Sequence, residues 1–152
     1  MELKITSPSF QNGGMIPGKY SYNNENVSPP LEWSALPSNA KSIALICDDP
    51  DAPSGDWVHW VIFNIPAGES RLPENIPQKK TLDNGVIQGI NDFRNTGYDG
   101  PTPPSGTHRY QFKIFALDNL LSLNAGATKS QLLKAMTGHI LAQGLLEGKY
   151  RK

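Results

Sequence analysis

The sequence of 152 residues has little of several features that would point to particular functions. Its single cysteine, Cys47, allows no internal disulfide and no zinc-finger spacing, and its place in the apolar run SIALIC favours a buried side chain. Lysine plus arginine and aspartate plus glutamate number 14 each, so no basic excess can neutralise nucleic-acid phosphates. No stretch approaches the roughly 20 apolar residues of a membrane helix. We therefore expect no nucleic-acid partner and no integral membrane segment.

Targeting signals and familiar enzyme motifs are also missing. The N-terminal MELKITSPSF has neither the basic nor the apolar region of a secretory signal, so we expect a cytoplasmic protein. There is no G-x-S-x-G elbow, no phosphate-binding P-loop and no G-x-G-x-x-G fingerprint. Ser54 and Ser105 stand near histidines in the sequence, but both belong to predicted turns. A Ser-His-Asp triad therefore has little support.

What the sequence does contain is typical of a β protein. Most of the 13 prolines and 14 glycines lie in the first two-thirds, as in short strands joined by turns. A length of 152 residues with 38% hydrophobic residues fits one domain over residues 1–152. The apolar pattern predicts strands at 43–48, 57–65, 85–90 and 109–117. The strand at 57–65 is apolar on both faces, which indicates a central position in a sheet.

The clearest strand is 109–117, RYQFKIFAL. Its alternation puts Tyr110 and the apolar residues on one face and Arg109 on the other. Extending the same period backward puts His108 on the face of Tyr110. Arg109 is expected to form an ion pair or to cap loop carbonyls.

After this strand the pattern becomes helical. Thr128 and Gln131 are spaced as a capping box. An apolar stripe follows at Leu132, Leu133, Ala135, Met136, Ile140 and Leu141. Gly138 and Gly144 weaken this helix, and His139 is expected to lie in it with a structural role. Together the elements predict a mainly β protein, an antiparallel β-sandwich with a few short helices, chiefly C-terminal.

Two histidines follow irregular loops rich in proline and glycine. DDPDAPSGDW leads to His59, and YDGPTPPSGT leads to His108. Because proline fixes its own φ and keeps the preceding residue extended, such loops favour a preformed site at the end of a sheet. A lone strand histidine usually only donates to a backbone carbonyl. Two histidines with an aspartate-rich segment beside them favour a shared site instead.

The same residues fit two different chemistries. Two histidines and one carboxylate form a facial metal triad, so a metal-dependent hydrolase using Asp49, His59 and His108 is one alternative. The other is an anion pocket, in which imidazole and tyrosine groups hold a phosphate or carboxylate while an aspartate fixes one imidazole tautomer. Asp51 is expected to be a turn former.

Two segments carry a family resemblance: DPDAP (49–53) followed by HW (59–60), and GPTPPSGTHRYQFKIFALD (100–118). Supporting segments are IPGKYSYNNENVSPPLEW (16–33), QGINDFRNTGYDG (88–100) and HILAQGLLEGKY (139–150). With these segments the sequence resembles the phosphatidylethanolamine-binding protein (PEBP) family, also called Raf kinase inhibitor protein-like, and most closely its bacterial and archaeal branch. The resemblance implies an antiparallel β-sandwich with a small anion pocket at one end of the large sheet.

The resemblance also implies which residues form that pocket. Carried over by motif position, the ligand-binding residues are Asp49, His59, His108 and Tyr110, with Pro50, Pro53, Pro103 and Pro104 at the rim. The implied function is non-enzymatic binding of a phosphate-like or phospholipid head-group ligand, with no cofactor and no metal. The resemblance also suggests a Raf kinase inhibitor-like regulator that recognises a protein partner or phosphorylated residue, and a homodimer. The Ala52–Pro53 peptide is expected to be cis, as at the matching place in the family.

Overall fold

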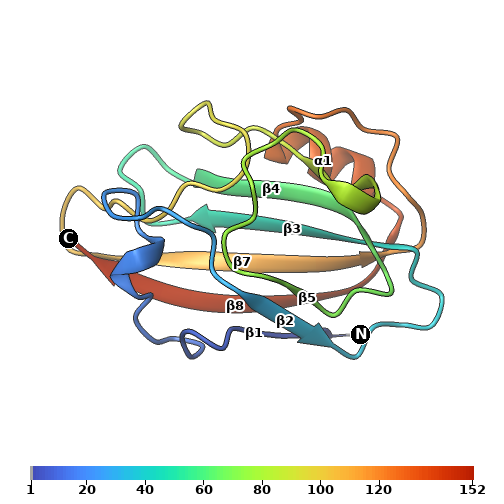
Figure 1. The fold of residues 1–152 in the computed structure, drawn as a ribbon, viewed down its shortest axis with the longest axis horizontal. Coiled ribbons are helices and arrows are strands. Elements are labelled where there is room, and N and C mark those ends of the chain that lie inside the picture. The colour runs from blue at the N-terminus through green and yellow to red at the C-terminus, as the bar shows by residue number, and fades with distance from the viewer. Residues whose placement is uncertain (1) are drawn as a thin grey trace.

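Two antiparallel β-sheets form most of the computed structural model, which describes residues 2–152 (Figure 1). The larger sheet has the strand order β6-β4-β3-β7-β8, and the smaller has the order β1-β2-β5. The strands are β1 (Lys4–Thr6), β2 (Leu31–Ser34), β3 (Ser42–Asp49), β4 (Trp57–Pro66), β5 (Arg71–Leu72), β6 (Ile87–Gln88), β7 (Thr107–Leu117) and β8 (Ile140–Arg151). One α-helix, α1 (Lys129–Met136), and two short 3-10 turns, η1 (Gly18–Tyr20) and η2 (Asp83–Gly85), complete the described chain. The predicted antiparallel sandwich is confirmed.

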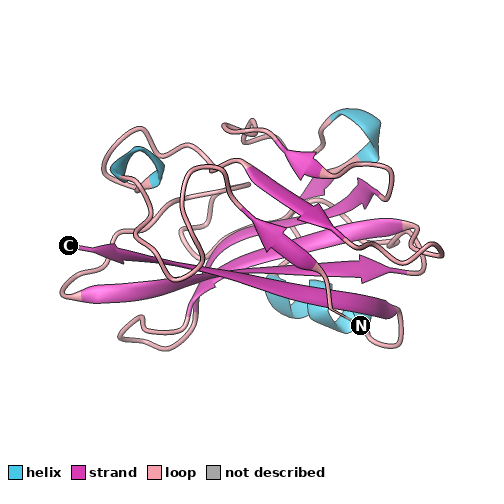
Figure 2. Ribbon diagram, turned by 90° about the horizontal axis from the view of Figure 1, so that it is seen from below, coloured by secondary structure: helices cyan, strands magenta, loops and turns pink. Residues whose placement is uncertain are grey.

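The central strands of the large sheet are buried because each of their faces meets a separate hydrophobic cluster. Ile43 and Leu45 of β3 pack in the cluster shared with the small sheet. Ile46 belongs to the cluster on the opposite face, together with Leu132 and Met136 of α1. Figure 2 shows α1 on one side of the long strands and the short strands on the other. None of the helices described in residues 2–152 is long and apolar enough to cross a membrane.

The predicted strands at 43–48, 57–65 and 109–117 correspond to β3, β4 and β7, with small shifts at their ends. The strand predicted at 85–90 is shorter, because only Ile87–Gln88 pair with β4. The residues before it turn: Asn84 and Gly85 have φ values of 64° and 81°, outside the β region. Cys47 is buried, as its apolar surroundings predicted.

Helix α1 begins as the capping box predicted. The Thr128 hydroxyl accepts a hydrogen bond from the Gln131 amide at 3.2 Å, and the Gln131 side chain accepts one from the Thr128 amide at 3.0 Å. The helix ends at Met136, and Gly138 follows with a φ of 82°, the left-handed conformation that commonly terminates a helix.

The predicted continuation of this helix is wrong. Ile140 and Leu141 belong to strand β8, and His139 lies in the turn between α1 and β8. Strand β8 pairs with β7 from Ile140 to Arg151. The apolar spacing that resembled a helical stripe is therefore overridden by tertiary pairing with a neighbouring strand.

The 50–56 loop between β3 and β4 also differs from expectation. The described residues contain no cis peptide bond, so the cis Ala52–Pro53 bond expected from the resemblance is not found. The trans form is the lower-energy isomer. The chain reverses instead through Gly55, which has a φ of 103° and donates its N–H to the Ala52 carbonyl at 3.0 Å.

Candidate functional site

The predicted ligand-binding residues meet at one end of the large sheet, where β3 ends and β4 and β7 begin (Figure 1). They line a cavity of about 290 Å³. The complete lining is Asp49, Ala52, Pro53, Ser54, Trp57, His59, Phe93, Thr102, Pro104, His108 and Tyr110. Because β3 lies between β4 and β7, its last residue Asp49 stands between the two strands that carry the histidines.

Two of the four prolines predicted at the rim lie at this cavity. Pro53 and Pro104 line the cavity, but Pro50 and Pro103 do not. Pro103 is buried and lines a neighbouring cavity of about 410 Å³ instead. Pro104 lines this neighbouring cavity as well, so it lies between the two cavities.

His108 is held by a carboxylate. Its Nδ1 lies 2.6 Å from Oδ2 of Asp49, a contact that becomes a salt bridge when the ring is protonated. The other oxygen of Asp49 accepts the Asp51 amide at 2.8 Å. Since a carboxylate can only accept, the Nδ1 of His108 carries the proton, and Nε2 is left for another partner.

His59 is held by a neutral group. Its Nδ1 lies 2.6 Å from the backbone carbonyl oxygen of Asp99, which can only accept. Nδ1 is therefore protonated, and Nε2 of the neutral ring is an acceptor. Burial lowers the pKa of His59 from its ordinary value of 6.5, so the ring is neutral at pH 7.

Tyr110 brings an unsatisfied hydroxyl to the cavity. Its side chain is 1% exposed, and its ring meets that of His59 edge to face at a centroid distance of 5.2 Å. Among residues 2–152 the hydroxyl has no partner in full hydrogen-bonding geometry, although the Asp49 side chain and the Thr102 backbone lie near it. Burial, reinforced by the charge of Asp49, raises the pKa of Tyr110 far above its ordinary value, so the hydroxyl keeps its proton. A buried donor without a partner costs stability unless a ligand or water accepts from it.

Asp99 is a site residue that the sequence prediction missed. Besides orienting His59 through its carbonyl, it buries a carboxylate that accepts hydrogen bonds from Asn26, Asn91 and Asn95 at 2.8, 2.9 and 2.9 Å. The segment at 91–99 is polar, but nothing in it distinguishes Asp99 as the residue that orients His59.

An aromatic wall was also missed. Phe93 stacks on Tyr22 at a centroid distance of 4.7 Å and meets Trp57 edge to face at 5.5 Å. Phe93 and Trp57 both line the cavity. Trp57 precedes His59 by two residues on β4, so strand alternation could have placed the two side chains on one face.

The cavity has little charge of its own. None of the described lining residues is lysine or arginine, and Asp49 is the one carboxylate among them. Within residues 2–152 no group of three or more histidine, cysteine, aspartate or glutamate side chains is arranged to hold a metal ion. Asp49 is engaged by His108 and by the Asp51 amide. The donor set therefore gives no support to the metal-dependent hydrolase considered above.

Arg109 forms the expected ion pair, with Asp51. Its Nε and Nη2 lie 3.0 and 2.9 Å from the two Asp51 oxygens, and its backbone amide adds a bond of 2.9 Å. Hydrogen bonding from the guanidinium lowers the pKa of Asp51 to about 2. Asp51 therefore fixes the loop through an ion pair, and the side chain that caps the turn is that of Asp49.

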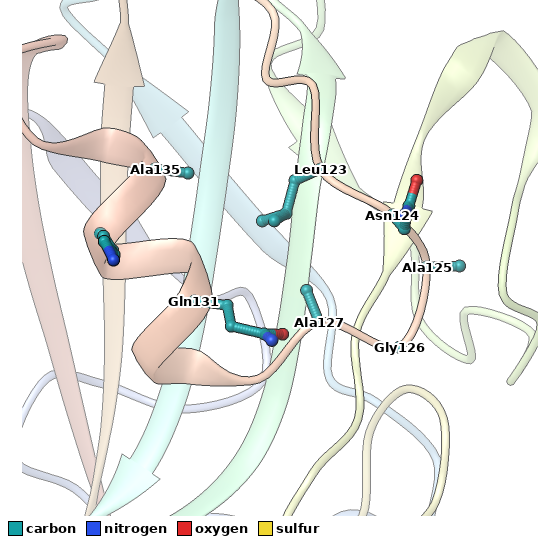
Figure 3. A pocket seen from close by; sticks show the side chains of 8 residues that line it. Leu123, Asn124, Ala125, Gly126, Ala127, Gln131 and Ala135 are labelled. Carbon is teal, nitrogen blue, oxygen red and sulfur yellow. The ribbon is translucent and has the colours of Figure 1, made fainter.

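A larger cavity, of about 540 Å³, lies elsewhere, between α1 and the 123–127 segment (Figure 3). Small and amide side chains dominate its lining, including Ala127, Gln131 and Ala135. It contains none of the predicted site residues and no histidine or carboxylate. Of these two cavities, the smaller one between His59 and His108 is thus the one lined by histidines.

Comparisons with known proteins agree with the motifs. The family model described as phosphatidylethanolamine-binding protein matches residues 6–151. A UPF0098 protein of Methanothermobacter thermautotrophicus is 51% identical over 150 residues, covering 99% of both chains. The crystal structure of a PEBP homologue from Chlamydia trachomatis matches with a TM-score of 0.91 and 42% identity, over 99% of this chain and 98% of that one. Escherichia coli YbcL, described as a member of the mammalian PEBP family, matches with a TM-score of 0.92 and 30% identity, over 100% of this chain and 99% of that one.

Proposed function

Because the chain belongs to the phosphatidylethanolamine-binding protein family, we propose that it binds a small ligand through a phosphate-like group, without transforming it, in the cavity between His59 and His108. The single observation that carries the proposal is the buried Tyr110 hydroxyl, a donor without a partner beside two histidines. An anionic oxygen would satisfy it.

Each polar group would have a defined part in this binding. Tyr110 donates its hydroxyl proton to one phosphate oxygen. His108, paired with Asp49 through Nδ1, donates from Nε2 to a second oxygen when its ring carries both protons. His59, neutral and bonded to Asp99 through Nδ1, accepts at Nε2 from a protonated oxygen. The cavity is therefore suited to the monoprotonated form of the group.

The rest of the ligand would lie against the apolar rim. Trp57, Phe93 and Pro104 offer contact surface but no fixed charge. A phospholipid head group and a phosphorylated side chain of a partner protein both present the same phosphate chemistry. The second source would make the protein a regulator of that partner, as in the Raf kinase inhibitor-like role.

The test is calorimetric titration with inorganic phosphate, phosphoethanolamine and a phosphoserine peptide. We expect binding at pH 5.5 that weakens toward pH 8, because the phosphate group loses the proton that it donates to Nε2 of His59. The matched variant Tyr110→Phe keeps the ring packing and removes only the hydroxyl, and it should weaken binding by about 5- to 10-fold, the worth of one hydrogen bond. Equal affinity at both pH values and in both proteins would refute the proposal.

A preference among the three ligands would identify the source. Tighter binding of phosphoethanolamine than of the peptide favours a lipid head group, and the reverse favours a protein partner. Turnover of any of them would contradict the non-enzymatic part of the proposal.

A further inference from the structure

The 50–56 loop, which supplies one wall of the cavity, is tied at both ends to the opposite face of the sheet. Asp48 precedes Asp49 on β3, and alternation points it away from the cavity, where it is fully buried. Asp56 ends the loop just before β4. Nζ of Lys129, the first residue of α1, lies 2.6 Å from Oδ2 of Asp48 and 2.6 Å from Oδ2 of Asp56. One ammonium group thus joins the two ends of the loop.

We infer that Lys129 is a positioning residue for the ligand cavity, holding the 50–56 loop closed at its base from outside the cavity. The inference rests on the proposed function for its ligand. Ala52, Pro53 and Ser54 of this loop line the cavity, so the separation of the loop's ends sets where this wall stands.

A role in stability alone does not account for this arrangement. Nζ of Lys113 also lies 3.1 Å from Oδ2 of Asp48, so the buried carboxylate has a cation partner without Lys129. Oδ1 of Asp48 is buried with no partner in the described chain. Incompletely satisfied buried ion clusters stabilise a fold poorly compared with apolar packing. The contribution that only Lys129 makes is the link to Asp56.

The remaining contacts of the loop act at other points. Arg109 holds Asp51 near its start, and Gly55 donates to Ala52 within it. Neither contact spans the base, where the strand pairing of Asp49 with Trp57 joins the two backbones and Lys129 adds the side-chain link on the opposite face. Burial alone would lower the pKa of Lys129, but its hydrogen bonds to Asp48 and Asp56 raise it, so the link persists at every pH used for binding.

The first experiment measures the loop without any ligand. Hydrogen exchange of the Gly55 amide, which is bonded to Ala52, reports how often the loop opens. We expect Lys129→Met to speed it by about 3- to 30-fold, the usual range for a remote coupling residue. Asp56→Asn, a change at an exposed residue, should act similarly. The matched control Lys113→Met removes the other cation from Asp48 and should leave Gly55 exchange unchanged.

The second experiment measures affinity for inorganic phosphate by calorimetry at pH 6. Lys129→Met and Asp56→Asn should weaken phosphate binding by about 3- to 30-fold. Lys129→Arg keeps a cation at this position and should bind phosphate as the wild type does. Lys113→Met should also bind with the affinity of the wild type. Unchanged exchange or affinity in Lys129→Met, or equal effects of Lys113→Met, overturns the inference. If Lys129→Met does not fold, Asp56→Asn decides alone. If the wild type binds no phosphate, the proposed function fails, and the exchange data still decide whether Lys129 sets the loop.

Discussion

His59 and His108 face one cavity from the two strands that flank β3, yet their Nδ1 atoms meet different partners. His108 donates to the carboxylate of Asp49, and His59 donates to the backbone carbonyl of Asp99. A carboxylate stabilises a positive charge on the ring, whereas the burial of His59 outweighs its hydrogen bond to the Asp99 carbonyl and keeps that ring neutral. The comparison shows that residue type alone does not fix the role of a histidine: burial and the hydrogen-bond partner together decide whether it donates or accepts toward a ligand.

The largest expected effect comes from removing His108, the histidine that pairs with Asp49. His108→Ala should weaken phosphate binding by about 10- to 150-fold, the range for a hydrogen bond to a charged group. Calorimetry measures the loss, and His139→Ala, which changes an exposed histidine paired with Asp118, is the control. If His108→Ala bound phosphate as tightly as the wild type, His108 would have no part in holding the ligand.

A smaller effect concerns how the free energy of unfolding changes with pH, and it arises from His59. Burial lowers its pKa in the folded state below the ordinary 6.5, so the unfolded chain binds the proton more readily. The stabilising contribution is complete above pH 6.5 and is lost as the pH falls toward the folded-state pKa, by up to about 1.4 kcal/mol for each pH unit. Urea unfolding between pH 8 and pH 5 measures this slope. His59→Gln should flatten it, and an unchanged slope in that variant would contradict the neutral role of His59.

The smallest expected effect is on the stability of a Tyr110 variant. Tyr110 adjoins both histidines, and changing it should affect phosphate affinity and the free energy of unfolding in different ways. Tyr110→Phe removes a buried hydroxyl that has no partner, so the free energy of unfolding should stay equal or rise by about 1 kcal/mol while phosphate affinity falls. Thermal unfolding without ligand measures the first quantity. A loss of stability would mean that the hydroxyl has a partner within the folded protein.

Much of this site could be predicted from the sequence because its residues sit in strongly patterned strands. Period-two alternation placed His108 and Tyr110 on one face, and both line the cavity. The family motifs supplied Asp49 and His59. Strand β8 could not be predicted, because Ile140 and Leu141 have helical apolar spacing and only pairing with β7 makes them a strand.

The supporting contacts were beyond sequence reasoning for a different reason. Asp99 holds His59 through a backbone carbonyl, which every residue type carries. Lys129 reaches Asp48 across a sequence separation of 81 residues, and nothing local marks the pair. The sequence also does not decide which histidine pairs with Asp49, since an aspartate at the end of β3 has a histidine on each neighbouring strand.

The central claim is that a phosphate group binds between His59 and His108. The most direct measurement follows the ring nitrogens of both histidines by NMR while inorganic phosphate is added at pH 6. The account predicts saturable changes at Nε2 of both rings, with His139 unaffected and Tyr110→Phe requiring more phosphate. Ring signals of His59 and His108 that stay constant throughout the titration would contradict it.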